Sequence, residues 1–193
     1  MPTVHFITHP EVAIDPAAPV PDWVLSDVGA ERAAALLRRS WITAIRTIFT
    51  SAERKAAQVA DMIGADRHLA PVTLAGLGEN DRSATGYLPS AEFEATADAF
   101  FARPDESIRG WERAVDAQHR IVAAVDRAVA MMRPDGDAVI VSHGGVGTLL
   151  LCHLKRIPIS RAEDQPGRGG GNVFRFDAAR RHLIMGWHSI EDS

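Results

Sequence analysis

The stretch Ala138-Val139-Ile140-Val141-Ser142-His143-Gly144-Gly145 decides how this chain folds. Its four consecutive apolar residues predict a strand that is buried on both faces of a sheet. The glycine pair and the apolar run from Val146 to Leu154 predict a helix that begins directly after this strand. A strand that passes straight into a helix is typical of parallel α/β sheets, so we expect His143 at the end of a central strand.

Two further segments follow the same pattern nearer the N-terminus. The residues from Thr3 to Thr8 are β-branched and apolar, and they stop at His9-Pro10. The residues from Ile45 to Phe49 predict a second strand, which leads into Thr50-Ser51-Ala52-Glu53. This tetrapeptide fits a capping box, so a helix that carries Arg54 is expected to begin there.

The carboxyl ends of parallel strands meet at one edge of a sheet, where such folds bind ligands. We therefore expect His9, Arg54 and His143 to converge at that edge. Two imidazoles and a guanidinium beside helix N-termini, whose free N–H groups attract anions, suit a phosphoryl group better than a metal or a hydride.

The remaining pattern completes an α/β fold. We expect a three-layer α/β/α sandwich, with a mostly parallel central sheet and helices on both faces. The chain is expected to form one domain over residues 1–193, with an inserted helical and loop region at about 78–106. The other predicted elements are a helix capped by Ser26 that runs to about Arg39, a helix capped by Ser90 and a helix from about Ser107 to Met132. A weaker strand is expected at Pro71–Ala75, and a closing hairpin at Asn172–Phe176 and His182–Trp187.

Composition narrows the class of protein. The 193 residues are 46% hydrophobic and carry a formal charge of −4, which argues against nucleic-acid and membrane partners. The lone Cys152 and the absence of a signal-peptide pattern predict a cytoplasmic protein. The histidines show no zinc-ligand spacing, so we expect no metal and no cofactor. The sequence leaves the oligomeric state open.

Five short motifs resemble those of the histidine phosphatase superfamily, also called phosphoglycerate-mutase-like, and they follow one another along the chain in the family's order. Leu25-Ser26-Asp27-Val28-Gly29 matches the family's L-[ST]-x-x-G, and Ser142 to Gly145 is its S-H-G-G motif intact. Thr8-His9-Pro10 resembles its R-H-G, Ser51-Ala52-Glu53-Arg54 its S-x-x-R, and Leu77-Gly78-Glu79 its L-x-E.

The resemblance implies a phosphatase that hydrolyses a phosphomonoester, in a small molecule or a phosphoprotein, through a phosphohistidine on His9. Arg54 and His143 would hold the phosphoryl oxygens, and Glu79 would be the general acid, a task that calls for a raised pKa. The residues expected to bind the substrate are Thr8, Ser51, Gly144 and Arg82.

Thr8 departs from the family, which has an arginine there. A hydrogen bond to a charged group contributes roughly 1.5–3 kcal/mol, so its loss would slow turnover by about one to two orders of magnitude. Candidates for a compensating cation are Arg82, Arg109, Arg113 and Arg120, although a solvated surface charge is favoured for each. Two alternatives stay open: Asp81 or Glu106 as the general acid, and a degenerate family member that binds a phosphorylated ligand without turning it over.

Overall fold

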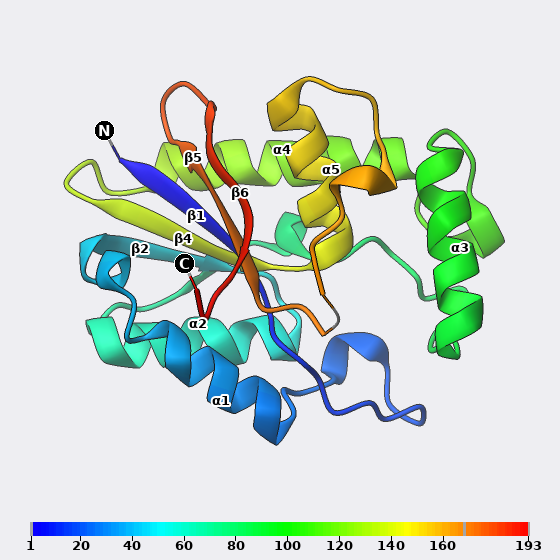
Figure 1. Ribbon diagram of the computed structural model, residues 1–193, viewed down its shortest axis with the longest axis horizontal. Helices are drawn as coiled ribbons and strands as arrows, with labels where there is room; N and C mark the ends of the chain where they lie inside the picture. The colour runs from blue at the N-terminus through cyan, green and yellow to red at the C-terminus, as the bar shows by residue number, and fades with distance from the viewer. Residues whose placement is uncertain (1, 168, 193) are drawn as a thin grey trace.

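A six-stranded sheet forms the centre of the computed structural model, which describes residues 2–167 and 169–192 (Figure 1). Strands β1, β2, β3 and β4 pair in parallel, whereas β5 is antiparallel to β1 and β6 is antiparallel to β5. The predicted α/β fold with a mostly parallel sheet is confirmed. In spatial order the strands are β3 (Val72–Thr73), β2 (Ile45–Thr50), β4 (Asp137–Ser142), β1 (Thr3–Thr8), β5 (Asn172–Asp177) and β6 (Leu183–Ser189).

Helices cover both faces of the sheet, as Figure 1 shows. Helices α1 (Asp27–Leu36) and α2 (Arg54–Arg67) lie on one face, and α4 (Ala114–Met131) and α5 (Gly144–Lys155) lie on the other. Helix α3 (Ser90–Ala102) packs beyond the edge of the sheet, against the Trp111 region, α4 and α5. The insertion expected at about 78–106 corresponds to the loop after β3 together with α3.

Strand β4 explains why its sequence is apolar throughout. Val139 and Val141 pack into the core under α1 and α2, whereas Ala138 and Ile140 pack into the core under α4 and α5. Successive side chains of a strand point to opposite faces, so a strand covered on both sides needs apolar residues at every position.

The helix starts differ from the sequence expectation in three places. Ser26 does cap α1, since its Oγ accepts a hydrogen bond from the Gly29 amide. The capping box predicted at 50–53 is wrong, because the Glu53 side chain makes no cap hydrogen bond to α2. Ser90 is likewise the first residue of α3 and not its cap.

Helix α4 begins at Ala114, later than the predicted Ser107. Arg109 and Gly110 interrupt the periodic pattern, because their φ angles of 53° and 82° lie in the left-handed region, which no α-helix can contain. Trp111 then leads into the helix and packs its ring against Phe93 and Phe100.

The register of the parallel strands brings the expected residues to one edge. Thr8 pairs with Ser142, and Thr50 pairs with Val141, so strands β1, β2 and β4 end at the same edge of the sheet and are followed there by His9, Ser51 and His143. In the part of the chain that the structure describes, no helix has the length and apolar character needed to span a bilayer.

Candidate active site

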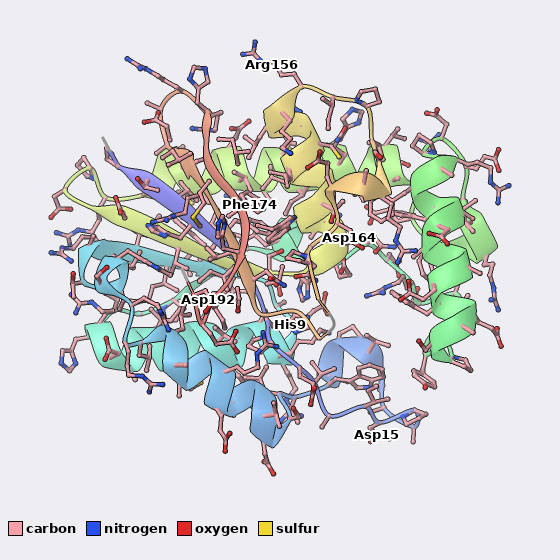
Figure 2. The ribbon with its side chains drawn as sticks, in the orientation of Figure 1. His9, Asp15, Arg156, Asp164, Phe174 and Asp192 are labelled. Carbon is pink, nitrogen blue, oxygen red and sulfur yellow. The ribbon has the colours of Figure 1, made fainter. Side chains whose placement is uncertain are left out.

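A hollow of about 730 Å³ opens at this carboxyl edge of the sheet. Figure 2 shows His9 there, where β1 leaves the sheet toward α1. The residues that line the hollow come from five segments of the chain, and those with polar side chains are Thr8, His9, Glu11, Glu79, Asn80, Arg82, Ser90, Glu94, Arg161, Asp164 and Gln165. The backbone of Gly144 and Gly145 also lines it.

His9 has the properties of a nucleophile. Its Nδ1 lies 2.8 Å from the Pro10 carbonyl oxygen, which can only accept a hydrogen bond. Nδ1 must therefore carry the proton, and Nε2 keeps its lone pair. Burial, with a smaller effect from His143, lowers the pKa of His9 from 6.5 to about 3. At neutral pH the ring is an uncharged imidazole with one free nitrogen.

His143 lies beside His9, with the ring centroids 5.2 Å apart. Its Nε2 is 2.8 Å from the Ser51 Oγ and 3.3 Å from a carboxylate oxygen of Glu53. Burial lowers the pKa of His143 against the opposing effect of Glu53 and Glu79. Its buried Nδ1 has no hydrogen-bond partner in the described structure, and His143 itself lies behind the residues that line the hollow.

Ser51 does not line the hollow, contrary to its expected contact with the substrate. The side chain is fully buried and bonds to His143, while its Oγ also accepts from the Glu53 amide. Ser51 therefore positions the imidazole ring of His143 through its Nε2 atom.

Lys55, and not Arg54, points into the protein beneath the two histidines. Arg54 is exposed at the first turn of α2, and the structure gives it no hydrogen bond or ion pair. The Lys55 side chain is 4% exposed, and its Nζ donates to a Glu53 carboxylate oxygen at 2.5 Å and to the Val20 carbonyl at 2.8 Å. The Lys55 charge also lowers the pKa of His9 and of His143, after the larger effect of burial.

Glu53 holds this group together. Its carboxylate accepts from Lys55, from the Glu79 amide at 2.8 Å, and lies within reach of His143. Burial opposes ionisation of Glu53, but these partners outweigh it and lower the pKa to about 2. The capping-box assignment hid this role, because it directed the Glu53 side chain toward its own helix.

Glu79 caps helix α5. Its carboxylate oxygens accept from the amides of Gly145 and Val146, both at 3.0 Å. Burial would raise its pKa, but Arg82, His143 and the Gly145 amide together lower it. The raised pKa expected of a general acid is thus absent in the free protein, because Arg82 above all, with His143 and the helix N-terminus, favours the anion. Of the alternatives, Asp81 and Glu106 are both exposed and outside the hollow.

Thr8 is buried in a hydrogen-bond network that connects strand β1 with Gln165 and Asn172 near the C-terminal end of the chain. Its Oγ accepts from the Asn172 amide at 3.0 Å and donates to the Gln165 Oε1 at 2.7 Å. The Asn172 Nδ2 donates to the same Gln165 oxygen at 3.1 Å. Two donors therefore fix the orientation of the Gln165 amide, and its Nε2 points toward Gly144, where an added Cβ would lie 2.3 Å away. Thr8 thus acts on the hollow through a neutral donor.

Arg82 is the only one of the four candidate compensating arginines that lines the hollow. Its Nη2 is 3.8 Å from a Glu79 carboxylate oxygen. Arg109 and Arg113 pair with surface carboxylates, and Arg120 binds Glu112 and the carbonyls of residues 76, 78 and 79. Arg120 therefore shapes the loop that presents Glu79.

Sequence reasoning missed several polar side chains of this region, namely Glu53, Lys55, Asn80 and Gln165. Asn80 is 6% exposed, lines the hollow and leaves its Nδ2 without a partner in the described chain. The sequence did carry a signal for Asn80, because it directly follows Glu79, which was already a candidate site residue. Across residues 2–167 and 169–192, no group of three or more His, Cys, Asp or Glu side chains is arranged to hold a metal.

Comparison with known proteins gives a family and a fold. The family model of the histidine phosphatase superfamily (branch 1) matches residues 12–184. The solved YhfR protein of Bacillus stearothermophilus is 22% identical, with a TM-score of 0.79 and coverage of 96% of this chain and 95% of that one. A mycobacterial glucosyl-3-phosphoglycerate phosphatase in complex with inorganic phosphate is 22% identical, with a TM-score of 0.77 and full coverage of both chains. No curated protein matches the sequence. The family match begins beyond Thr8-His9-Pro10, so it does not depend on these three residues.

Proposed function

The chain belongs to the histidine phosphatase superfamily, and from this premise we propose that it hydrolyses phosphomonoesters through a phosphohistidine on His9. The substrate is a phosphorylated small molecule or phosphoprotein. The observation that carries the proposal is the fixed tautomer of His9, a residue that lines the hollow: its neutral ring donates Nδ1–H to the Pro10 carbonyl, so Nε2 keeps its lone pair.

In the first step, Nε2 of His9 attacks phosphorus, the N–P bond forms and the P–O bond to the leaving group breaks. The phosphorylated ring keeps its Nδ1 proton and becomes cationic, and the Pro10 carbonyl stabilises that charge. In the second step, water attacks phosphorus, the N–P bond breaks, and inorganic phosphate leaves while His9 returns to its neutral form.

Glu79 supplies the proton to the leaving oxygen and takes one from the attacking water. In the free protein it is an anion, but a phosphoryl dianion bound beside it disfavours a second negative charge and raises its pKa. The same dianion favours the protonated form of His143, whose Nε2–H then faces Glu53 and whose Nδ1–H faces the phosphoryl oxygens. Substrate binding thus places the protons that the reaction needs.

The charge at the site also supports a second candidate, a protein that binds a phosphorylated ligand without turning it over. Glu53 pairs with Lys55, and Glu79 lies 3.8 Å from Arg82, so the cations near His9 are already offset by carboxylates. The uncharged donors of Asn80 and Gln165 add hydrogen bonds without adding charge. Binding and turnover can therefore be separated in this site.

One experiment distinguishes the two candidates. The protein is incubated with 4-nitrophenyl phosphate, quenched in base and digested, and the peptide that carries His9 is examined for an acid-labile phosphoryl group. The control variants are His9→Ala and His182→Ala, the latter removing an exposed histidine far from the hollow. Hydrolysis predicts label and turnover in the wild type and in His182→Ala alone. Saturable binding of inorganic phosphate with neither label nor turnover would refute hydrolysis and favour the second candidate.

A further inference from the structure

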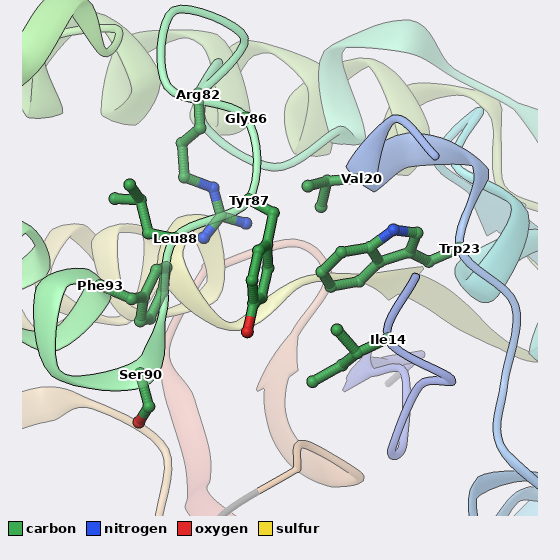
Figure 3. Close-up of a pocket in the computed structure, with 9 residues that line it drawn as sticks. All are labelled: Ile14, Val20, Trp23, Arg82, Gly86, Tyr87, Leu88, Ser90 and Phe93. Carbon is green, nitrogen blue, oxygen red and sulfur yellow. The ribbon is translucent and has the colours of Figure 1, made fainter. Parts of the chain in front are cut away.

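A second hollow of about 290 Å³ adjoins the first, and it is apolar. Both hollows share the four lining residues Ile14, Arg82, Ser90 and Phe93, so a molecule that occupies one can extend into the other. Figure 3 shows Trp23 beside Tyr87 in the lining of this second hollow, with Val20 above and Ile14 below the Trp23 ring. The chemistry at His9 makes no use of it.

The walls of this hollow are mainly apolar, and their polar side-chain groups are the Arg82 guanidinium and the hydroxyls of Ser90 and Tyr87. The indole Nε1–H of Trp23 is already donated to the carbonyls of Asp15 and Ala18, at 2.8 and 3.2 Å. The Trp23 ring packs against that of Tyr87, with the ring centroids 5.9 Å apart and the planes inclined by 54°, so the two rings form one apolar wall. A group rich in hydroxyls would lose more hydrogen bonds to water here than these few polar groups replace.

Arg82 marks the boundary between the two hollows. Its guanidinium is held over the rings of Phe93 and Trp111, at 5.2 and 5.5 Å from their centroids. Its Nη2 also lies 3.8 Å from Glu79. A leaving oxygen placed beside Glu79 therefore has the rest of its molecule next to Arg82, at the boundary of the hollow that Trp23 and Tyr87 line.

We propose that this second hollow binds the leaving group of the substrate, and that the substrate class is the phosphomonoester of an alcohol with an aromatic or extended aliphatic part. The inference rests on the proposed phosphatase function and deepens it. A dry cavity of about 150 Å³ accommodates benzene, so a space twice as large suits two fused rings. Burial of such a group is expected to raise kcat/KM by about 10- to 100-fold.

The test compares three primary alkyl phosphates, whose leaving groups have similar intrinsic reactivity: 2-(2-naphthyl)ethyl phosphate, ethyl phosphate and glucose 6-phosphate. We expect the naphthyl ester to have a kcat/KM at least tenfold above that of the other two. Trp23→Ala and Tyr87→Ala are each expected to lower the ratio of naphthyl to ethyl ester about tenfold. Tyr87 is 38% exposed, so its variant is expected to fold even if the Trp23 variant does not.

Ile184→Ala is the matched control, because Ile184 is 57% exposed on β6 and does not line either hollow. A naphthyl-to-ethyl ratio near one, or a ratio that the two aromatic variants leave unchanged, would overturn the proposal. Calorimetric measurement of the affinity for the same esters tests the apolar subsite independently of catalysis. If none of the esters is hydrolysed, the phosphatase function fails, while tighter binding of the naphthyl ester, weakened in Tyr87→Ala, would still support the apolar subsite.

Discussion

Replacing Lys55 and Arg54 in turn by methionine tests which cation serves the phosphoryl group. Lys55 is buried against Glu53, whereas Arg54 is exposed on the same turn of α2. We expect Lys55→Met to lower kcat by about 10- to 100-fold, since it removes the charge-assisted contact that holds Glu53 beside His143, and such a contact contributes roughly 1.5–3 kcal/mol. Arg54→Met is expected to change the rate by less than twofold.

Stability measurements separate this effect from misfolding. Removing one member of a buried ion pair costs about 3–5 kcal/mol, because the other charge stays buried without its partner. Urea unfolding should therefore show a large loss for Lys55→Met and a change of about 0.5 kcal/mol or less for Arg54→Met. Lys55→Arg restores the charge and is expected to recover turnover. A large loss of activity in Arg54→Met, with Lys55→Met fully active, would refute the reasoning and return the role to Arg54.

Three further predictions follow from the same contacts. Binding of inorganic phosphate near pH 6.5 should take up protons, because the bound anion raises the lowered pKa values of Glu79 and His143. Calorimetry in two buffers of different ionisation enthalpy measures the number of protons taken up, and an uptake of zero would contradict the prediction. The pKa of Glu53 is about 2 in the folded protein and 4.5 in the unfolded chain, so Glu53 contributes up to about 3 kcal/mol to the free energy of unfolding. This contribution is present above pH 4.5 and is lost as the pH falls toward 2. In Glu53→Gln the free energy of unfolding should therefore lack this decrease in acid. Thr8→Val should cost about 1–3 kcal/mol of stability and raise KM by releasing Gln165, whereas Thr8→Ser keeps both hydrogen bonds and should behave as the wild type.

The order of strands and helices was predictable because it depends on local patterns. The apolar run at 138–141 and the β-branched run at 3–8 each form a buried strand, and His9 and His143 follow those strands as expected. The starts of α2 and α4 were not predictable to the same degree. Glu53 finds partners in two distant segments, at Glu79 and His143, and the left-handed backbone at Arg109 and Gly110 interrupts a periodic pattern that looks continuous in the sequence.

The sequence by itself determined the α/β fold and the placement of the two histidines at the carboxyl edge of the sheet, since hydrophobic periodicity acts over neighbouring residues. Only the tertiary structure decided which side chains share that edge. Lys55 turns inward because Glu53 and Val20 accept its hydrogen bonds, and the pKa of Glu79 is lowered because Glu79 meets Arg82, His143 and the N-terminus of α5. Thr8 meets Gln165 across 157 positions of the chain. Contacts between distant segments of this kind set the charges and hydrogen bonds of the site, and no local pattern encodes them.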